Sequence, residues 1–425
     1  MKNILTIFGV LILSVGSLFA QDDQLTVKEV EIEASKGNEL KPIAGQYIVV
    51  LKENTAKPVV MQKKAKIADR EQKEQNTRTA RTNNLNKLRN VASKNNIKES
   101  NIVAEFGDVL VGFAAKLNDN EVKSLRANSE IAGVYQDYEV ELAIEDFCIE
   151  DIADECALEE AMLAQTTTCA ITNAGGFVDG SGKGTWIWIL DTGIDLDHPD
   201  LNVQTSPTFA KSFIAGQTVE DGHGHGTHVA GIAAAKNNSI GVVGVSAGAR
   251  VVPVKVLPNS GPGSFSGIIA GLNHVAMYDI PGDVVNMSIQ SYGWSNCENA
   301  NPTLRDAIRN LGNAGTWVVM AAGNSSGDAN RDLPGCVNGT KVLTVGSLTC
   351  AHGCSSFSNF GKPPIDWVAV GSSVYSTYKN GSYGTMSGTS MAAPVVAGIV
   401  HARNGAPLSA GTVNCGGKTY SRARR

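Results

Sequence analysis

The chain has 425 residues, of which 42% are apolar and 18% are charged, and 45 are glycines. This apolar fraction is enough for a large core and excludes a chain that is disordered throughout, and the length favours two or three domains. A net charge of −5 and an aromatic content of 6% give no reason to expect a nucleic-acid partner.

The first twenty residues have the pattern of an export signal. Lys2 gives a basic start, and an apolar stretch from Ile4 to Ala20 comes next and ends in a small residue. A membrane anchor is the alternative, but the stretch is short for a span and is interrupted by glycine and serine. We predict a signal peptide over residues 1–20 and a secreted protein, either extracellular or periplasmic, with no membrane attachment once the signal is removed.

The cysteine content fits an oxidising compartment. There are eight cysteines, an even number, which favours disulfides in an exported protein. No repeated CxxC pair is present, and this disfavours a zinc ribbon. We expect the pairs Cys297–Cys336 and Cys350–Cys354.

The N-terminal part predicts a small α+β domain. Gly45–Leu51, Val109–Phe113 and Val134–Leu142 are β-branched or apolar runs typical of strands. Met61–Asn95 is rich in Lys, Gln, Arg and Ala and is predicted to be helical, as is the shorter Asp119–Ala127. The order β-α-β-β-α-β favours two layers, with the helices on one face of a sheet.

Charge separates this domain from the rest of the chain. Lys57–Lys98 holds 12 basic and 3 acidic residues, whereas Asp137–Glu160 holds 11 acidic residues and no basic one. The chain is therefore modular. We place a first domain at residues 21–143, an acidic linker containing the processing site at 144–165, and a larger domain at 166–425.

In the larger domain, strand-like and helix-like runs alternate. The strand-like runs are continuously apolar, which indicates a parallel sheet buried on both faces by helices. They are Thr185–Leu190, Arg250–Leu257, Asp283–Met287, Trp317–Ala321 and Val342–Gly346, and the helical runs are Thr227–Ala235, Ser266–Met277, Thr303–Ala314 and Val395–Val400. In such sheets, functional sites form beyond the carboxyl ends of the strands.

Two polar clusters lie at such positions. Asp191 directly follows a buried strand, where a carboxylate needs partners and can orient a histidine. In Asp221–Gly231 a histidine that enters a helix at Thr227 can serve as a general base. Three histidines in this segment are closely spaced, so a metal site is the alternative, but the HExxH pattern of zinc peptidases is absent.

A third cluster surrounds Ser390, which lies among glycine and small residues just before the apolar run Val395–Val400. At a helix N-terminus its backbone N–H and the helix dipole favour a developing oxyanion, although an N-cap serine is the plainer alternative. Asn324 follows a buried strand and can donate a hydrogen bond to the same oxyanion. Alone, it would be an ordinary turn asparagine.

The order Asp, His, Asn, Ser at strand ends and helix starts is that of subtilisin. The motifs Asp191–Ile194, His198–Leu201, His225–Gly231 and Gly388–Pro394 are long and specific. From Gly180 to Val400 the chain resembles the subtilisin-like serine peptidases of the subtilisin and proteinase K type. The segments Gly45–Leu51 and Phe106–Leu142 resemble the inhibitory propeptide of that family.

This resemblance implies a three-layer α/β/α fold with a mostly parallel central sheet, preceded by a ferredoxin-like propeptide that acts as intramolecular inhibitor and chaperone. It implies a monomeric, secreted serine endopeptidase that is made as an autoprocessed zymogen and cleaves extended protein or peptide substrates. Ser390 would be the nucleophile, His225 the general base and Asp191 the residue that orients it. Asn324 and the Ser390 N–H would form the oxyanion hole, with His228 packed on the helix and His223 exposed.

The resemblance also places substrate between two edges, at Gly261–Phe265 and Asn286–Ser288. The substrate-binding residues would be Gly263, Ser288 and Gly323. Gln290 departs from the family pattern, which has glycine there, and Asp332 either lies at the base of the primary pocket, favouring basic side chains, or is a surface loop acid.

Calcium is the expected cofactor. Residues 236–242 resemble the calcium loop of the family, and calcium takes six to eight oxygen ligands. The implied ligands are the side chains of Asp200 and Asn238 and the carbonyls of Lys236, Ile240 and Val242. An unmetallated turn is the alternative, and no organic cofactor is expected.

Three points stay open from the sequence. The Gln165–Thr166 bond is our first choice for the processing site. A catalytically silent binding module is an alternative function. No expected catalytic residue is substituted, and the one feature in favour of this alternative is the short C-terminal part, in which 35 residues follow Ser390. A selective processing protease, rather than a broad degradative one, is the other alternative, on account of Gln290 and Asp332.

Overall fold

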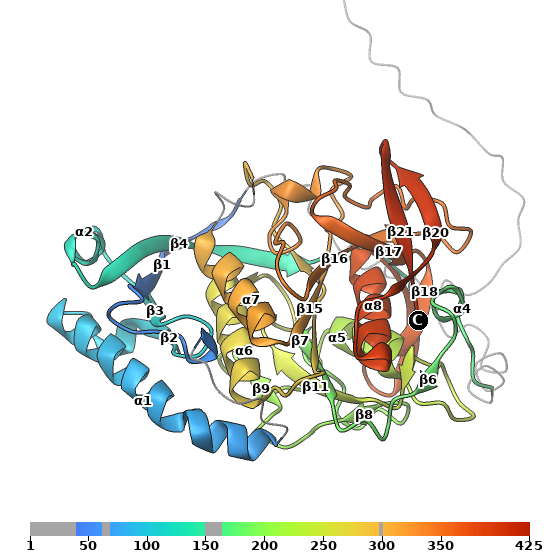
Figure 1. Cartoon of the computed structure of the whole chain (residues 1–425), viewed down its shortest axis with the longest axis horizontal. Helices are drawn as coiled ribbons and strands as arrows, with labels where there is room; N and C mark the ends of the chain where they lie inside the picture. Colours follow the sequence, from blue (N-terminus) through green and yellow to red (C-terminus); the bar gives the residue numbers. More distant parts are fainter. Residues whose placement is uncertain (1–39, 62–68, 149–163, 297–300) are drawn as a thin grey trace, which may run out of the picture. The chain divides into compact units, whose positions relative to one another are not determined.

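A computed structural model describes residues 40–61, 69–148, 164–296 and 301–425 of the chain (Figure 1). The predicted signal peptide and most of the predicted acidic linker lie outside these residues. Within the described part, no helix is both long and apolar enough to cross a membrane.

The helices of the structure are short to medium in length. The α-helices are α1 (Arg70–Lys94), α2 (Asp119–Ala127), α4 (Cys169–Asn173), α5 (His225–Ala234), α6 (Phe265–Tyr278), α7 (Pro302–Ala314) and α8 (Thr389–Arg403). Three 3-10 turns are η1 (Val59–Met61), η2 (Glu99–Asn101) and η3 (Ala329–Arg331).

The strands fall into the small N-terminal domain and the larger domain. The first group is β1 (Pro42–Leu51), β2 (Ile102–Phe106), β3 (Gly112–Lys116) and β4 (Ile131–Leu142), followed by β5 (Asp146–Cys148). The second group is β6 (Val178–Asp179), β7 (Trp186–Asp191), β8 (Asn202–Val203), β9 (Lys211–Ser212), β10 (Ser246–Ala247), β11 (Arg250–Lys255), β12 (Gly263–Ser264), β13 (Val284–Met287), β14 (Ile289–Gln290), β15 (Trp317–Ala321), β16 (Val342–Leu348), β17 (Ile365–Val370), β18 (Val374–Tyr378), β19 (Ser382–Ser387), β20 (Leu408–Cys415) and β21 (Lys418–Arg424).

The small domain has the predicted β-α-β-β-α-β order. Its antiparallel strands lie in the order β4-β1-β3-β2, and α1 and α2 bury apolar side chains such as Leu88 and Leu125 against Phe113. Asn118 begins α2 with a capping box that it shares with Glu121, and this explains why that helix was predicted with the correct bounds.

The larger domain is built on a mainly parallel sheet, in which β20 runs antiparallel to β21. The strand order is β20-β21-β17-β16-β15-β13-β7-β11-β8, with β9 also paired to β11. Alternate residues of β7 belong to opposite cores: Ile187 and Ile189 pack with α5 and α8, whereas Trp188 packs with α6 and α7. Figure 1 shows these two helix pairs on either side of β7 and β15, which confirms the predicted three layers.

Some element boundaries differ from those predicted. The strand expected at Val109–Phe113 begins at Gly112, and β2, which the predicted order requires, was not assigned to residues because Ala104 and Glu105 interrupt its apolar pattern. In the described residues α1 begins at Arg70, where the Asp69 side chain accepts a hydrogen bond from the Gln72 N–H, rather than at Met61. Helix α8 begins six residues earlier than predicted, so Ser390 lies inside its first turn.

The disulfide prediction was partly wrong. Cys350 pairs with Cys169 and Cys354 pairs with Cys415, so the expected Cys350–Cys354 bond is not formed. These two long-range bonds attach α4 and the β20–β21 hairpin to the loop after β16. Cys336 is also disulfide-bonded, and Cys297 lies outside the described residues.

Candidate active site

The site begins with Asp191, the last residue of the buried strand β7. Its side chain is fully buried, and its Oδ1 accepts a hydrogen bond from the Thr192 N–H at 2.7 Å and lies 2.7 Å from Nδ1 of His225. A carboxylate oxygen that accepts both bonds requires the proton on Nδ1 of the imidazole. The His225 Nε2 atom is then the basic nitrogen; it is buried and has no hydrogen-bond partner among the described residues.

His225 is held by the loop before α5, whose N-cap Gly224 has a φ of 106°. The organising side chain is Asp221, which sequence reasoning did not single out. Its Oδ1 accepts from the Thr192 hydroxyl and from the backbone N–H groups of His223 and Gly224, and its Oδ2 accepts from both the N–H and hydroxyl of Thr227. Asp221 therefore fixes the start of α5 relative to the end of β7.

The other histidines of this segment have structural contacts. His228 is fully buried, and its Nε2 faces the carbonyls of Val374 and Gly384, each at 3.0 Å. Burial lowers the pKa of His228 to about 3, so it is neutral. His223 is half-buried rather than exposed as predicted, and desolvation lowers its pKa.

Ser390 lies in the first turn of α8 and is fully buried. Its hydroxyl donates to the Ser288 carbonyl at 3.1 Å, and the Ser288 hydroxyl donates to the Ser390 carbonyl at 2.8 Å. That carbonyl is available because Pro394, four residues on, has no N–H to bond it. The proline inside α8 therefore leaves the Ser390 carbonyl free to bond Ser288, which lies between β13 and β14.

Asn324 follows β15, and its side chain is oriented by the start of α8. The Asn324 Oδ1 accepts from both the N–H and the hydroxyl of Thr389, at 2.9 and 2.7 Å. The amide Nδ2 therefore points away from Thr389, and it is buried without a hydrogen-bond partner in the described part of the chain. A Cβ placed on Gly388 would meet the Ala143 carbonyl oxygen at 2.4 Å and Asn324 Nδ2 at 3.2 Å, so both atoms face the same glycine.

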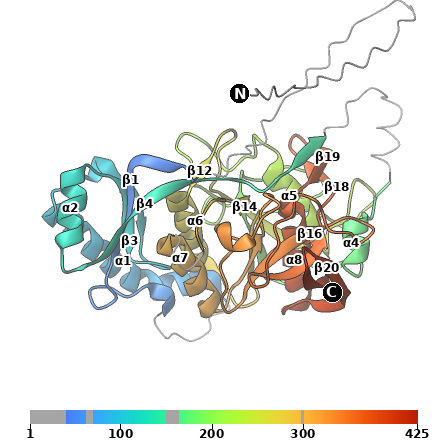
Figure 2. The same cartoon turned by 90° about the horizontal axis from the view of Figure 1, so that it is seen from above.

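The C-terminal part of β4 runs through this site as an extended strand. Val140 pairs with Gly263 of β12 on one side, and Leu142 pairs with Ile289 of β14 on the other, both antiparallel (Figure 2). The Ala143 N–H then donates to the Ser288 carbonyl at 3.3 Å, and the Ala143 carbonyl accepts from the Ser390 N–H at 3.1 Å.

The chain continues beyond Ala143 in the same extended form. The Glu145 N–H donates to the Ser387 carbonyl at 2.8 Å, and β5 pairs with β19. The site therefore holds a continuous segment of its own chain, bonded on both sides of Ala143.

The residues predicted to bind calcium lie together. Asp200 is fully buried, and its carboxylate accepts from Asn238 Nδ2 at 2.8 Å and from the Val242 N–H at 3.0 Å. Gln165, which was not predicted as a ligand, reaches the same loop: its Nε2 donates to the Lys236 carbonyl at 2.8 Å and lies 3.5 Å from the Asn238 Oδ1. Among the described side chains, no lysine or arginine forms a salt bridge with Asp200.

Asp332 is not a surface acid. It is 1% exposed, accepts from the Ser291 N–H at 3.0 Å and the Asn359 Nδ2 at 3.0 Å, and lies directly behind Gly323. Burial raises the pKa of Asp332 to about 8. The Gln290 side chain lies nearby, and its Oε1 accepts from the Asn324 N–H at 2.9 Å.

Comparisons with known proteins show which families the chain resembles. The family model described as Subtilase family matches residues 182–403, and that of Peptidase inhibitor I9 matches residues 46–143. A cuticle-degrading protease of Metarhizium anisopliae is 34% identical over 68% of this chain and 69% of its own length. The alkaline serine protease ver112 of Corniculantispora psalliotae is 31% identical over 84% of this chain and 80% of its own length.

A solved structure of a cold adapted subtilisin-like serine proteinase is 32% identical, with a TM-score of 0.45, and the match covers 53% of this chain and 76% of that one. The two family matches together cover most of the small domain and, in the larger one, the elements from β7 to α8. The chain belongs to the subtilase family, and is a subtilisin-like serine endopeptidase that carries an I9-type inhibitor domain as its propeptide.

Proposed function

We propose that Ser390 is the nucleophile of this endopeptidase, that His225 is its general base and that Asp191 orients His225. The observation that carries the proposal is the peptide group of Ala143, whose carbonyl accepts a hydrogen bond from the Ser390 N–H at 3.1 Å. A backbone segment bonded on both sides of this residue is in the pose of an extended substrate. Ala143 then occupies the position of the residue before the scissile bond.

The chemistry follows from the tautomer of His225. For reaction, the Ser390 hydroxyl turns from the Ser288 carbonyl toward His225 Nε2, which takes its proton as Oγ bonds to the substrate carbonyl carbon. The same imidazolium then gives its proton to the leaving amine, and the acyl group stays on Ser390. Water, deprotonated by His225, hydrolyses this ester and restores the serine.

The oxyanion is held by two donors. The Ser390 N–H already contacts the Ala143 carbonyl. Asn324 Nδ2 is buried, has no partner among the described residues, and lies next to Gly388, as the Ala143 carbonyl does. A donor without a ground-state partner can form its bond as negative charge develops on the oxygen, which stabilises the transition state more than the substrate. Thr389 is a positioning residue, because it fixes the amide of Asn324.

We propose that substrates bind as a strand between β12 and β14, as β4 does. The backbone of Gly263 would pair with the fourth residue before the scissile bond, and the Ser288 carbonyl with the N–H of the residue directly before it. Gly323 would form part of the pocket wall, since Asp332 lies behind it and leaves no room for a side chain there.

We propose that the zymogen is first cut between Ala143 and Ile144, rather than at the Gln165–Thr166 bond that we favoured from the sequence. The contacts of Ala143 with Ser288 and Ser390 support this bond, as does the end of the inhibitor match at residue 143. After the cut, the small domain would remain as a bound inhibitor with its new C-terminus in the site. Export by a signal peptide over residues 1–20 and a monomeric state remain part of this proposal.

Intact mass measurement of the secreted protein tests it. Wild type should lose residues up to Ala143, and Ser390→Ala should keep them, because the cut needs the nucleophile. Ser356→Ala, a change at an exposed serine outside the site, should be processed like wild type. A first cut at another bond would refute the assigned scissile bond, and cutting of the Ser390→Ala chain in pure form would refute self-processing.

We propose calcium as a structural cofactor at the loop 236–242. The donor set consists of oxygens: the Asp200 carboxylate, the Asn238 amide oxygen and the carbonyls of Lys236, Ile240 and Val242. Gln165 can add a further amide oxygen, because a flip of its side-chain amide exchanges the positions of the oxygen and the nitrogen. One buried carboxylate with no salt-bridge partner among the described side chains, surrounded by neutral oxygens, fits a hard divalent cation.

A further inference from the structure

The space beside Ala143 is bounded by two backbone segments. On one side, Ser288 accepts the Ala143 N–H and is followed by Ile289 and Gln290 of β14. On the other, Gly323 and Asn324 follow β15 and are tied to the start of α8 through Thr389. A side chain on the residue before the scissile bond has to enter between these two segments.

The Gln290 side chain crosses from the first segment to the second. Its backbone pairs with Glu141 of β4, while its Oε1 accepts from the Asn324 N–H at 2.9 Å. This bond holds the glutamine amide against the segment that carries the oxyanion-hole donor. Ala143, whose methyl group is the smallest side chain of a chiral residue, is fully buried between the Ser288 carbonyl and the Ser390 N–H that its backbone bonds.

The two segments are also braced from behind, so the gap does not easily widen. Asp332 accepts from the Ser291 N–H of the first segment and from Asn359 Nδ2. Asn359 in turn accepts from the N–H groups of Ser325 and Gly327 in the second segment. A larger substrate side chain would have to break this network or displace Gln290.

We propose that Gln290 is a specificity-determining residue that limits the side chain before the scissile bond to about the size of alanine. The proposal rests on the proposed function, because it takes Ala143 as the model of a bound substrate. Asp332 is not open to a substrate side chain: it is 1% exposed, lies behind Gly323, and has its oxygens bonded by the Ser291 N–H and Asn359 Nδ2. We therefore expect no preference for basic residues.

The test compares peptides that copy the end of β4. Mature enzyme is titrated with a fluorophosphonate, and kcat/KM is measured for succinyl-Val-Glu-Leu-Ala-p-nitroanilide and for the same peptide ending in Phe or Lys. Wild type should favour Ala over Phe by at least about tenfold, which is the low end of the discrimination that a pocket shows against a side chain of the wrong size. In Gln290→Ala the ratio of Phe to Ala should rise about tenfold or more.

Gln290→Glu is the matched control, because it keeps the side-chain length and the acceptor of the Asn324 N–H. Its Phe-to-Ala ratio should stay close to that of wild type. A ratio within one variant cancels any general loss of activity. A wild type that cleaves Phe as well as Ala, or a ratio unchanged in Gln290→Ala, would overturn the proposal, whereas absence of fluorophosphonate labelling would instead count against the proposed catalytic residues.

Discussion

At the scale of single residues, the site depends on side chains that fix other side chains. Thr389 gives both its N–H and its hydroxyl to the Asn324 Oδ1, so the free Nδ2 has one orientation. Asp221 likewise fixes the loop that carries His225, by hydrogen bonds to its backbone. Neither residue contacts the Ala143 peptide group, yet each determines where a proposed catalytic atom lies.

The oxyanion-hole assignment makes a kinetic prediction. Asn324→Ala removes a donor that acts in the transition state, so kcat should fall by about 10²–10³ with little change in KM, a magnitude taken from subtilisin itself. Steady-state kinetics on the titrated enzyme measure this. Asn330→Ala, at a half-buried position in the 3-10 turn η3 outside the site, should keep the kcat of the parent; an Asn324→Ala enzyme with unchanged kcat contradicts the assignment.

A second prediction at this scale concerns Asp332. An unfolded aspartate ionises near pH 4, whereas burial raises the pKa of Asp332 to about 8 in the folded chain. Between these values the folded state binds a proton that the unfolded state has lost, so the free energy of unfolding falls as the pH rises from about 4 to about 8. Asp332→Asn removes this dependence.

Thermal unfolding of uncut Ser390→Ala, with and without Asp332→Asn, checks the sign. The Tm of the aspartate form, taken relative to the asparagine form, should decrease steadily between pH 5 and pH 8. The comparison at each pH cancels every other titrating group that the two proteins share. Parallel Tm curves would show that Asp332 has an ordinary pKa.

The residues themselves show what sequence can predict. Asp191, His225, Asn324 and Ser390 each follow a buried strand or begin a helix, and this local pattern placed them at one edge of the sheet. The sequence did not decide whether Asp332 lies in the pocket or on the surface, because its burial depends on Asn359 and Ser291, which are distant in sequence. Gln165 was missed as a neighbour of the 236–242 loop for the same reason.

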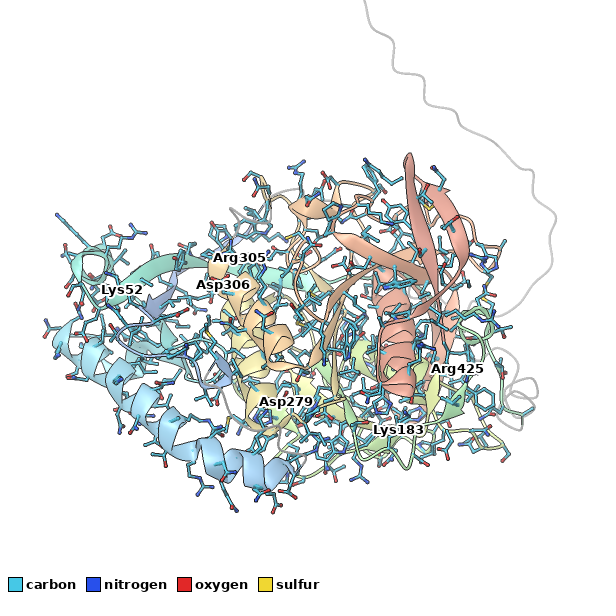
Figure 3. All side chains as sticks on the ribbon, viewed as in Figure 1. Lys52, Lys183, Asp279, Arg305, Asp306 and Arg425 are labelled. Atoms are coloured by element: carbon cyan, nitrogen blue, oxygen red, sulfur yellow. A yellow bond between two sulfur atoms is a disulfide. The ribbon has the colours of Figure 1, made fainter. Side chains whose placement is uncertain are left out.

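At the scale of elements, α1 is attached to the larger domain by one arginine. Arg70 is 7% exposed, and its guanidinium bonds both oxygens of the buried Asp283 and the carbonyls of Tyr278 and Gly184. It also lies 3.5 Å from the centre of the Trp186 ring. Lys73, one turn on, pairs with Asp279, which follows α6 and is labelled in Figure 3.

We expect Arg70 to dominate the affinity of the cut propeptide. Arg70→Ala leaves Asp283 buried without its cation, which should weaken the complex by about 2–5 kcal/mol. After processing, co-elution of the propeptide in size-exclusion chromatography should be lost and peptidase activity should appear sooner. Arg78→Ala, at an exposed ion pair on the same helix, is the control. Equal retention of the propeptide in both variants would contradict the expectation.

The bounds of helices and strands could be predicted where residues close together in the sequence determine them. The bounds of α2 and β15 agree with the sequence, because a capping box and a purely apolar run mark them. The β20–β21 hairpin was not predicted: its strands are polar and largely exposed, and they join the sheet through pairing with β17 and the Cys354–Cys415 bond. Such long-range pairing leaves no periodic pattern in the sequence.

At the scale of the whole molecule, the loop 236–242 connects distant parts of the larger domain. Asp200 lies between β7 and β8, the loop follows α5, and Gln165 belongs to the start of the described larger domain. In addition, the Thr166 N–H donates to the Gly241 carbonyl at 2.7 Å. An ion held here would bind the folded chain and not the unfolded one, so it would stabilise the fold by linkage.

Removal of calcium should therefore lower stability more than activity. In uncut Ser390→Ala, a chelator should lower Tm by roughly 5–10 °C, since an ion at about 100 times its Kd contributes about 2.7 kcal/mol. Asp200→Asn lacks the one carboxylate of the site and should unfold at a lower temperature with or without chelator. The prediction is contradicted if chelation leaves the parent unchanged, or if Asp200→Asn responds to chelator as fully as the parent does.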